Sequence, residues 1–273
     1  MIFVIGGTGF VGSAYVRLFA RLGLEHRVIT RATRDQFIGT RCDIVIDCNG
    51  NSKKFLAERE PLLDFDMSVR SVAQSLEAFP CDTYVLLSSG DVYPDQSDFA
   101  RTQEEQVIDP AAVSRYGRHK LLAEQLVRGG ARNWLIMRMG GFIGPGLKKN
   151  AIFDILSEAP VWLSPESELQ FISTDRAAGL VWGLIEQGVR REVINLGANG
   201  LVNIGKLCDR LGSHSEFRPQ APKVRYELNL NKLARLYDGA LPNSEDEVNN
   251  FIAQWRGVSP VIAPTRKIDK VDR

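Results

Sequence analysis

The feature that most constrains this chain is its beginning, where apolar residues run directly into four glycines within seven positions. Ile2–Ile5 predicts a buried strand, and the apolar residues after the glycines recur at helical spacing until Gly23 ends the helix. The glycines therefore occupy a strand-to-helix turn. Such a turn lets a pyrophosphate approach the backbone closely, and the free N–H groups at the helix N-terminus favour an anion. The candidate cofactor-binding residues of this turn are Gly6, Gly7, Thr8, Gly9, Phe10, Val11 and Gly12.

The residues after the second strand bear on which dinucleotide is bound. We predict that strand over Arg27–Thr30, and a cofactor with a free ribose 2′-hydroxyl usually meets an acid at its end. This chain has Thr30 and Arg31 there, with Arg34 nearby, and cations suit a 2′-phosphate. We therefore favour NADP(H). NAD(H) remains an alternative, because Asp35 follows closely and the arginines can be solvated loop residues.

Strands and helices alternate over the first half of the chain. A strand over Asp43–Asp47 follows the second strand after only about a dozen residues, so a full helical crossover hardly fits and the sheet should be trimmed there. A helix is predicted over Leu62–Ala78, and "DTYVLLSS" predicts the next buried strand. The alternation predicts a doubly wound parallel α/β sheet, in which ligands bind at the carboxyl ends of the strands. Ser88 and Ser89 stand at such an end.

The segment "SRYGRHKLLAEQLV" predicts a helix that carries Tyr116 and Lys120 four residues apart. This spacing places a phenol and an ammonium on one helix face. A nearby cation favours phenolate, so we expect the pKa of Tyr116 to be lowered and the residue to act as a general acid or base. A plain surface pair is the alternative, but the glycine turn and the serine pair favour the functional interpretation.

Composition excludes several classes of function. The 273 residues carry a formal net charge of +1 with no basic block, which argues against nucleic-acid binding. No apolar run is long enough to span a membrane, and the first five residues do not resemble a signal peptide. The four cysteines and three histidines show no metal-ligand spacing, so no metal is expected. Scattered thiols predict a reducing compartment, so we expect the cytoplasm.

Together these motifs resemble the extended short-chain dehydrogenase/reductase family, the group of sugar-nucleotide epimerases, dehydratases and reductases. The matching segments, in chain order, are "GGTGFVG", "LLSSGDVYPD", "YGRHK", "RMGGFIGPG", "QFISTDRAAGLVWGLI" and "EVINLGANGLVNIGKLCDRL". The resemblance implies a Rossmann domain with a small C-terminal lobe that holds the substrate. We assign residues 1–140 and 171–197 to the dinucleotide-binding domain, residues 141–170 and 198–256 to the substrate lobe, and residues 257–273 to a poorly packed tail.

The resemblance also implies roles for individual residues. Tyr116 exchanges a proton with the substrate oxygen, Lys120 binds the nicotinamide ribose and lowers the pKa of Tyr116, and the Ser89 hydroxyl binds the same substrate oxygen. Ser88 takes the place of Ser89 if the register is shifted by one residue. Met139 lines the nicotinamide end of the cofactor. The candidate substrate-binding residues are Ser89, Asp91, Gly140, Gly141, Lys148 and Arg225.

Three positions depart from the family pattern. Gly141 stands where an Asn often contacts nucleotide phosphate, and Ser68 stands where an Asn often braces the site. Gly90 precedes Asp91 where dehydratases carry an Asp-Glu pair, so a dehydratase is disfavoured. We therefore expect reduction of a keto group on a sugar nucleotide or a related polar ketone. The alternatives are an NAD-dependent epimerase, a non-catalytic dinucleotide sensor, and a substrate without a nucleotide.

For the C-terminal lobe we predict a helix over Ala151–Ser157, a strand near Pro160–Leu163, a helix with Leu233 and Leu236, and a final amphipathic helix. Lys148 and Lys149, after the "GPG" turn, meet substrate phosphate or are solvated. The resemblance implies a homodimer that forms through the helix carrying Tyr116 and its neighbour.

Overall fold

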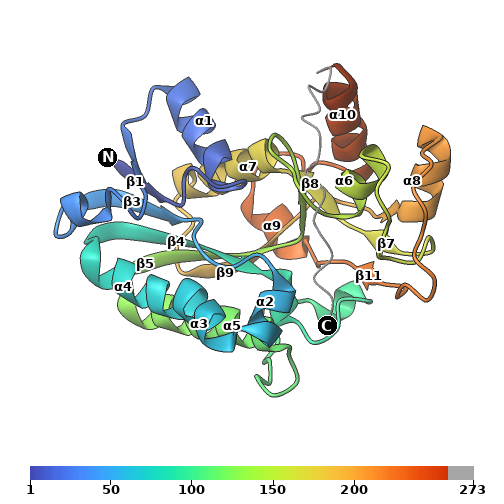
Figure 1. Ribbon diagram of the computed structural model, residues 1–273. Helices are drawn as coiled ribbons and strands as arrows, with labels where there is room; N and C mark the ends of the chain where they lie inside the picture. Colours follow the sequence, from blue (N-terminus) through green and yellow to red (C-terminus); the bar gives the residue numbers. More distant parts are fainter. Residues whose placement is uncertain (258–273) are drawn as a thin grey trace.

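A six-stranded sheet forms the centre of the computed structural model, which describes residues 1–257 (Figure 1). Its order is β2-β1-β3-β4-β5-β9, and every neighbouring pair is parallel. The strands are β1 (Ile2–Ile5), β2 (His26–Ile29), β3 (Cys42–Asp47), β4 (Cys81–Ser89), β5 (Asn133–Met139) and β9 (Glu192–Leu196). This order confirms the predicted doubly wound parallel sheet. The predicted tail, residues 257–273, lies outside the described residues except for Gly257.

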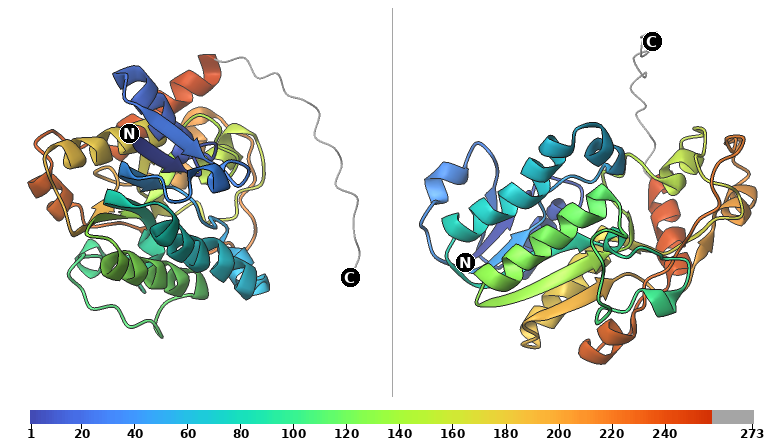
Figure 2. Two further views of the ribbon diagram at one scale, coloured as in Figure 1. Left: turned by 90° about the vertical axis from the view of Figure 1, so that its left-hand side faces the viewer. Right: turned by 90° about the horizontal axis from the view of Figure 1, so that it is seen from below.

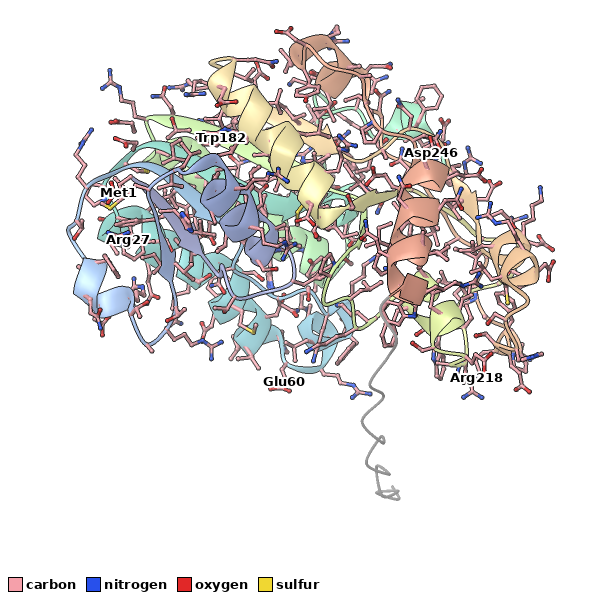
Figure 3. All side chains as sticks on the ribbon, turned by 90° about the horizontal axis from the view of Figure 1, so that it is seen from above. Met1, Arg27, Glu60, Trp182, Arg218 and Asp246 are labelled. Carbon is pink, nitrogen blue, oxygen red and sulfur yellow. The ribbon has the colours of Figure 1, made fainter. Side chains whose placement is uncertain are left out.

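Helices cover both faces of the sheet (Figure 2). Helices α1 (Gly12–Leu22) and α7 (Thr174–Glu186) pack together on one face, where Trp182 (labelled in Figure 3) lies edge-on to Phe19 with ring centroids 5.2 Å apart. Helices α4 (Ser71–Ala78) and α5 (Arg115–Gly130) cover the other face. Each face has its own apolar cluster, and the strands other than the edge strand β2 are largely buried between them. None of the helices within residues 1–257 combines the length and apolar character needed to cross a bilayer.

The first half of the chain matches most of the sequence prediction and departs from it locally. Only a 3-10 turn, Arg34–Phe37, lies between β2 and β3, so the sheet is trimmed as expected. Strand β2 begins and ends one residue earlier than predicted. The predicted helix over 62–78 is helical but not uniform, because α3 (Pro61–Phe65) and α4 flank a π-helical turn, Asp66–Arg70. Helix α2 (Lys54–Arg59) was not predicted.

The C-terminal region builds two small sheets beside the carboxyl end of the large one. Strand β6 (Gly141–Ile143) pairs with β8 (Phe171–Ser173), and β7 (Glu168–Leu169) lies between β10 (Val202–Asn203) and β11 (Arg225–Tyr226). Helices α6 (Ala151–Leu156), α8 (Ile204–Leu211) and α10 (Ser244–Gly257) share a third apolar cluster with these strands. Helix α9 (Asn231–Leu236) instead packs on the large sheet through Leu233.

The predicted strand near Pro160–Leu163 is wrong. Only Val161 makes a bridge there, to Phe217, and Trp162 is 66% exposed. Proline lacks the N–H that a ladder needs, and Pro160 removes one such donor at the start of the segment. The neighbouring strand begins later, at Glu168.

Candidate active site

The glycine positions of the turn after β1 leave little room for a side chain. Gly6 has φ 72°, and a Cβ atom at Gly12 would lie 2.3 Å from the Gly6 carbonyl oxygen. The Gly9 N–H donates to that same oxygen at 2.9 Å, which closes the turn. Val11 precedes α1 without a side-chain cap, so the first N–H groups of α1 have no side-chain acceptor from the residue at its start. This close-packed turn at the start of a helix fits the pyrophosphate of a dinucleotide.

The two arginines after β2 differ in their surroundings. Arg31 is exposed and makes no side-chain hydrogen bond or ion pair with any of residues 1–257. Arg34 donates to the Gln74 carbonyl at 3.1 Å and lies 5.7 Å from the centre of the Phe79 ring. Thr30 and Thr33 hydrogen-bond one another and shape the loop. Of the two cations, Arg31 is therefore the one free to meet a 2′-phosphate.

The two serines at the end of β4 point to opposite faces, as neighbours on a strand must. Ser88 is fully buried and donates to Glu124 at 2.6 Å. Ser89 donates to Asp91 at 3.1 Å, and the Asp91 N–H donates back to the Ser89 hydroxyl at 3.2 Å. Asp91 belongs to a 3-10 turn, Gly90–Val92, directly after the strand. Ser89 is thus the serine that contacts Asp91, whereas Ser88 contacts Glu124.

Tyr116 and Lys120 share the buried face of α5, with the Lys120 Nζ 5.6 Å from the centre of the Tyr116 ring. The prediction that the pKa of Tyr116 is lowered is wrong for the protein without a bound cofactor. Burial raises the pKa of Tyr116 above its usual value and the Asp91 carboxylate raises it further, while a hydrogen-bonding contribution from Ser89 opposes them. The ammonium lies over the ring, and its charge faces the carboxylates of Asp47 and Asp64.

Lys120 is buried against the loop that follows β3. Burial lowers the pKa of Lys120, and Asp47 and Asp64 oppose that shift. A Cβ atom at Gly50, where φ is 131°, would lie 3.0 Å from the Lys120 Nζ. Asp47 is held by the Tyr84 hydroxyl at 2.5 Å. The glycine lets the loop of residues 47–51 approach the ammonium.

A buried polar cluster, which the sequence analysis missed, lies beside Lys120. Asp64 is fully buried and accepts hydrogen bonds from His119 Nδ1 at 2.5 Å and Asn51 Nδ2 at 2.7 Å. Ser68, predicted to replace a bracing Asn, lies 3.5 Å from the same carboxylate and accepts from the Asn51 N–H at 3.4 Å. His119 follows Tyr116 by three residues on α5, and this helical spacing was the available signal.

Three glycines beside Ser89 and at the start of β6 have close neighbours. A Cβ atom at Gly90 would lie 3.0 Å from a methyl group of Leu228, so this side chain fills the place where dehydratases carry their acid. A Cβ atom at Gly141 would lie 2.6 Å from the Gln170 carbonyl oxygen, so no Asn fits without a backbone shift. Gly140 is less crowded, with Leu228 at 3.6 Å. Met139, the last residue of β5, is half-buried.

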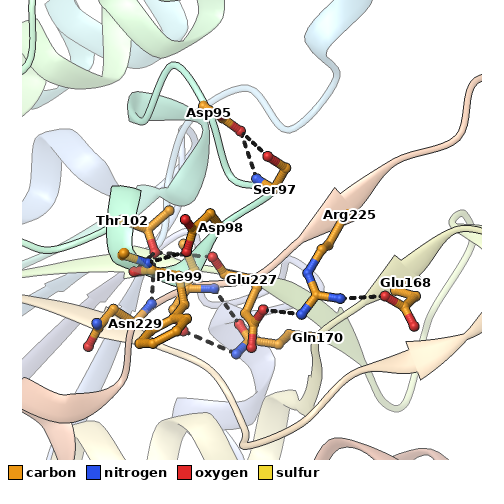
Figure 4. A network of polar contacts seen from close by, with 12 residues as sticks. Asp95, Ser97, Asp98, Phe99, Thr102, Glu168, Gln170, Arg225, Glu227 and Asn229 are labelled. Atoms are coloured by element: carbon orange, nitrogen blue, oxygen red, sulfur yellow. Dashed lines mark hydrogen bonds and ion pairs between the residues drawn. The ribbon is translucent and has the colours of Figure 1, made fainter.

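The two remaining candidate substrate residues lie in the C-terminal region. Arg225 on β11 is paired with Glu168 and with Glu227, the latter at 2.6 Å (Figure 4). Both carboxylates raise the pKa of this guanidinium. Lys148 is exposed, whereas the Lys149 ammonium donates to the backbone carbonyl of Ser52. Arg225 therefore has its charge satisfied within the protein.

This sheet order, with a glycine-rich turn after its first strand and a Ser, a Tyr and a Lys near its carboxyl end, defines an extended short-chain dehydrogenase/reductase. The sequence matches the family model described as "NAD dependent epimerase/dehydratase family" over residues 2–197. The chain belongs to that family, which confirms the resemblance.

Several solved structures share the fold. A UDP-galactose 4-epimerase superposes with a TM-score of 0.76 at 21% identity, covering 94% of this chain and 98% of that one. RMD from Pseudomonas aeruginosa, complexed with NADPH, gives 0.75 at 19% identity, with coverages of 93% and 99%. The protein MoeE5, in complex with UDP-glucuronic acid and NAD, gives 0.79 at 16% identity, with coverages of 95% and 99%. A comparison with curated proteins gave no match.

Proposed function

We propose that this protein is an NAD(P)-dependent oxidoreductase that reduces a keto group of a sugar nucleotide or a related polar ketone, with NADPH as the favoured cofactor. The observation that carries the proposal is the arrangement of Ser89, Tyr116 and Lys120 beside the carboxyl end of β4, in a sheet that begins with the glycine-rich turn. The family of the chain supports the dinucleotide.

The proposed chemistry assigns one task to each side chain. A bound dinucleotide supplies the hydride. Tyr116, which burial and Asp91 keep protonated, donates a proton to the developing oxyanion, and the Ser89 hydroxyl donates a hydrogen bond to the same oxygen. Lys120 holds the cofactor ribose and is fixed by the Gly50 loop. The glycine-rich turn and Met139 complete the proposed cofactor site. The assignment of residues 1–140 and 171–197 to the dinucleotide-binding domain is part of the same proposal.

The preference for NADPH rests on Arg31, which is exposed and makes no side-chain hydrogen bond or ion pair within residues 1–257, while Thr30 and Arg34 flank it. Titration with NADPH and NADH tests it in wild type, Arg31→Ala and the control Arg21→Ala, an exposed arginine at the end of α1. NADPH should bind at least tenfold tighter, which is about 1.4 kcal/mol, and only Arg31→Ala should remove that difference. Equal binding of the two cofactors in wild type would contradict the preference.

An NAD-dependent epimerase is the second candidate. The fold shared with UDP-galactose 4-epimerase and with the NAD complex of MoeE5 supports it. Sugar-nucleotide isomers separated by chromatography, with no net change in cofactor absorbance, would favour this candidate over a reductase. A non-catalytic sensor is the third. If wild type binds the cofactor but neither reduces a ketone nor interconverts sugar-nucleotide isomers faster than Tyr116→Phe does, the sensor replaces both enzymes.

We also propose a homodimer and a cytoplasmic location. Leu62 and Leu63 on α3 are 80% and 43% exposed, and Leu122 on the neighbouring α5 is 43% exposed. Apolar side chains on adjacent helices favour a second copy as partner. Light scattering during gel filtration should give twice the chain mass for wild type and a smaller species for Leu62→Glu. The cytoplasm is proposed because all four cysteines are free thiols.

A further inference from the structure

Three lysines from two separate loops approach one another beside the candidate active site. Lys53 and Lys54 lie at the start of α2, and Lys149 follows β6. The Lys149 ammonium donates to the backbone carbonyl of Ser52 and lies 3.3 Å from the Ser52 hydroxyl. Partial burial lowers the pKa of Lys149, and the charges of Lys53 and Lys54 lower it further. The three ammonium groups therefore repel one another at a place where water screens their charges only in part.

Lys54 connects these lysines to the catalytic group. Its ammonium lies 2.6 Å from Asp91 Oδ1, and the other oxygen of Asp91 accepts the hydrogen bond from Ser89 at 3.1 Å. The same ammonium lies 5.0 Å from the centre of the Tyr226 ring on β11. Within residues 1–257, Asp91 is the one carboxylate paired with any of the three lysines. Of the three ammonium groups, only that of Lys54 has a carboxylate partner, and the other two keep their charges unpaired within residues 1–257.

Buried groups hold the loop that carries two of these lysines. The Asn51 side chain donates to the Lys53 carbonyl at 2.8 Å and accepts from the Lys53 N–H at 2.7 Å. Asn51 is 3% exposed and is held by Asp64, which in turn is held by His119. The backbone at Lys53 is therefore fixed from both sides by a buried hydrogen-bonded chain. A fixed backbone holds the Cα atoms of Lys53 and Lys54 near the site before any ligand arrives, which lowers the cost of ordering on binding.

We propose that Lys53, Lys54 and Lys149 bind a phosphate or carboxylate group of a ligand that reaches the site beside Ser89. This inference rests on the proposed function, because Ser89 is taken as the residue that meets the substrate. Ammonium groups bind such anions through charge-assisted hydrogen bonds. Arg225 is less suited to the task, because Glu168 and Glu227 already pair with it. The anionic group belongs either to the substrate or to the pyrophosphate of the dinucleotide, and both have the same chemistry.

The test uses inorganic pyrophosphate as the probe and the full-length protein. Isothermal titration calorimetry measures its affinity for wild type, Lys149→Gln, the Lys53→Gln/Lys54→Gln/Lys149→Gln variant, and the control Lys206→Gln, an exposed lysine on α8. We expect the triple variant to bind pyrophosphate at least tenfold more weakly, Lys149→Gln to lie between, and the control to stay within twofold of wild type. All four proteins should show the same thermal melting profile, because the three lysines are exposed.

A second titration, on protein saturated with NADPH, distinguishes the two sources of the anion. If pyrophosphate still binds to the NADPH-saturated wild type, and binds more weakly to the triple variant, the lysines bind an anionic group of the substrate. If NADPH prevents pyrophosphate binding, the lysines bind the pyrophosphate of the cofactor. Equal affinity of wild type and the triple variant, or no binding by wild type, overturns the proposal. Failure of wild type to bind NADPH or NADH contradicts the proposed function instead, and the pyrophosphate titration on the free protein does not depend on it.

Discussion

Arg138 and Glu124 form a buried two-point ion pair behind the candidate catalytic residues, with Nε–Oε1 and Nη2–Oε2 distances of 3.1 and 2.8 Å. Arg138 lies on β5 and Glu124 on α5, two turns after Tyr116. Glu124 also accepts the hydrogen bond of Ser88, and Arg138 donates to Tyr93 at 3.0 Å. The pair thus ties the helix that carries Tyr116 and Lys120 to the strand that ends at Ser89.

Removal of one charge from this pair should destabilise the fold. Glu124→Gln leaves the Arg138 guanidinium buried without its counter-charge, and such a loss costs about 3–5 kcal/mol. The exposed pair Arg70–Asp66 provides the control, since Asp66→Asn should cost only about 0.3–0.5 kcal/mol. Urea unfolding measures both. Equal stabilities of the two variants would show that the buried pair contributes no more than a surface one.

The two serines of β4 should separate stability from chemistry. Ser88→Ala removes a hydrogen bond to a buried carboxylate and should cost about 1–3 kcal/mol of unfolding free energy, with kcat close to wild type. Ser89→Ala removes a donor to the substrate oxygen and should lower kcat about 100-fold or more with little change in stability. Unfolding curves and steady-state kinetics on the same samples make the comparison. The reverse pattern would assign the catalytic hydroxyl to Ser88.

The phenol of Tyr116 should stay protonated throughout the usual range of assay pH. Burial and then Asp91 raise its pKa above the ordinary value of 10.0, so the neutral acid is the form present below that pH. The ultraviolet difference between wild type and Tyr116→Phe should show no phenolate from this residue at pH 10. Asp91→Asn removes a nearby negative charge and should move the phenolate signal to lower pH. A phenolate signal near neutral pH in the cofactor-free wild type would contradict this assignment.

Leu228 should make even a methyl group at position 90 unfavourable. A Cβ atom at Gly90 lies 3.0 Å from Leu228 Cδ2, and overpacking of this kind costs about 1–3 kcal/mol. Gly90→Ala should therefore lower the midpoint of thermal unfolding, and adding Leu228→Ala should cost less than the sum of the two single changes. Strict additivity of the two changes would show that Leu228 is not the obstacle.

The glycine-rich turn should lose cofactor binding with a single methyl group. Gly12→Ala places a Cβ atom 2.3 Å from the Gly6 carbonyl oxygen, so the turn must open and its N–H groups must move. NADPH affinity measured by fluorescence should fall at least tenfold. Gly179→Ala is the matched control, because Gly179 lies within α7 and a Cβ atom added there would have no atom outside the helix backbone within 4 Å. This change should stabilise the helix by about 0.5–1 kcal/mol. An unchanged NADPH affinity in Gly12→Ala would remove this turn from the cofactor site.

Periodicity along the chain was enough to predict most of the large sheet. The apolar strand of Ile2–Ile5, the glycine turn and the helix up to Leu22 follow from local spacing, as does the common face of Tyr116 and Lys120. The π-helical turn Asp66–Arg70 was not predicted, and the strand predicted near Pro160 is absent. Both differences arise because propensity does not record which backbone groups find a partner in the folded chain. The roles of the candidate site residues remain predictions that the experiments above test.

The sequence by itself determined the family, the order of the motifs and the residues that face one another on a single helix or strand, because these depend on repeats of a few residues. Only the tertiary structure decided that Ser88 is bound to Glu124, that Arg225 is paired with two carboxylates, and that burial raises the pKa of Tyr116. It also brought Lys149 to Lys53 and Lys54 from nearly a hundred residues away. The physical reason is that desolvation and side-chain partners depend on neighbours in space, which residues far apart in the chain supply.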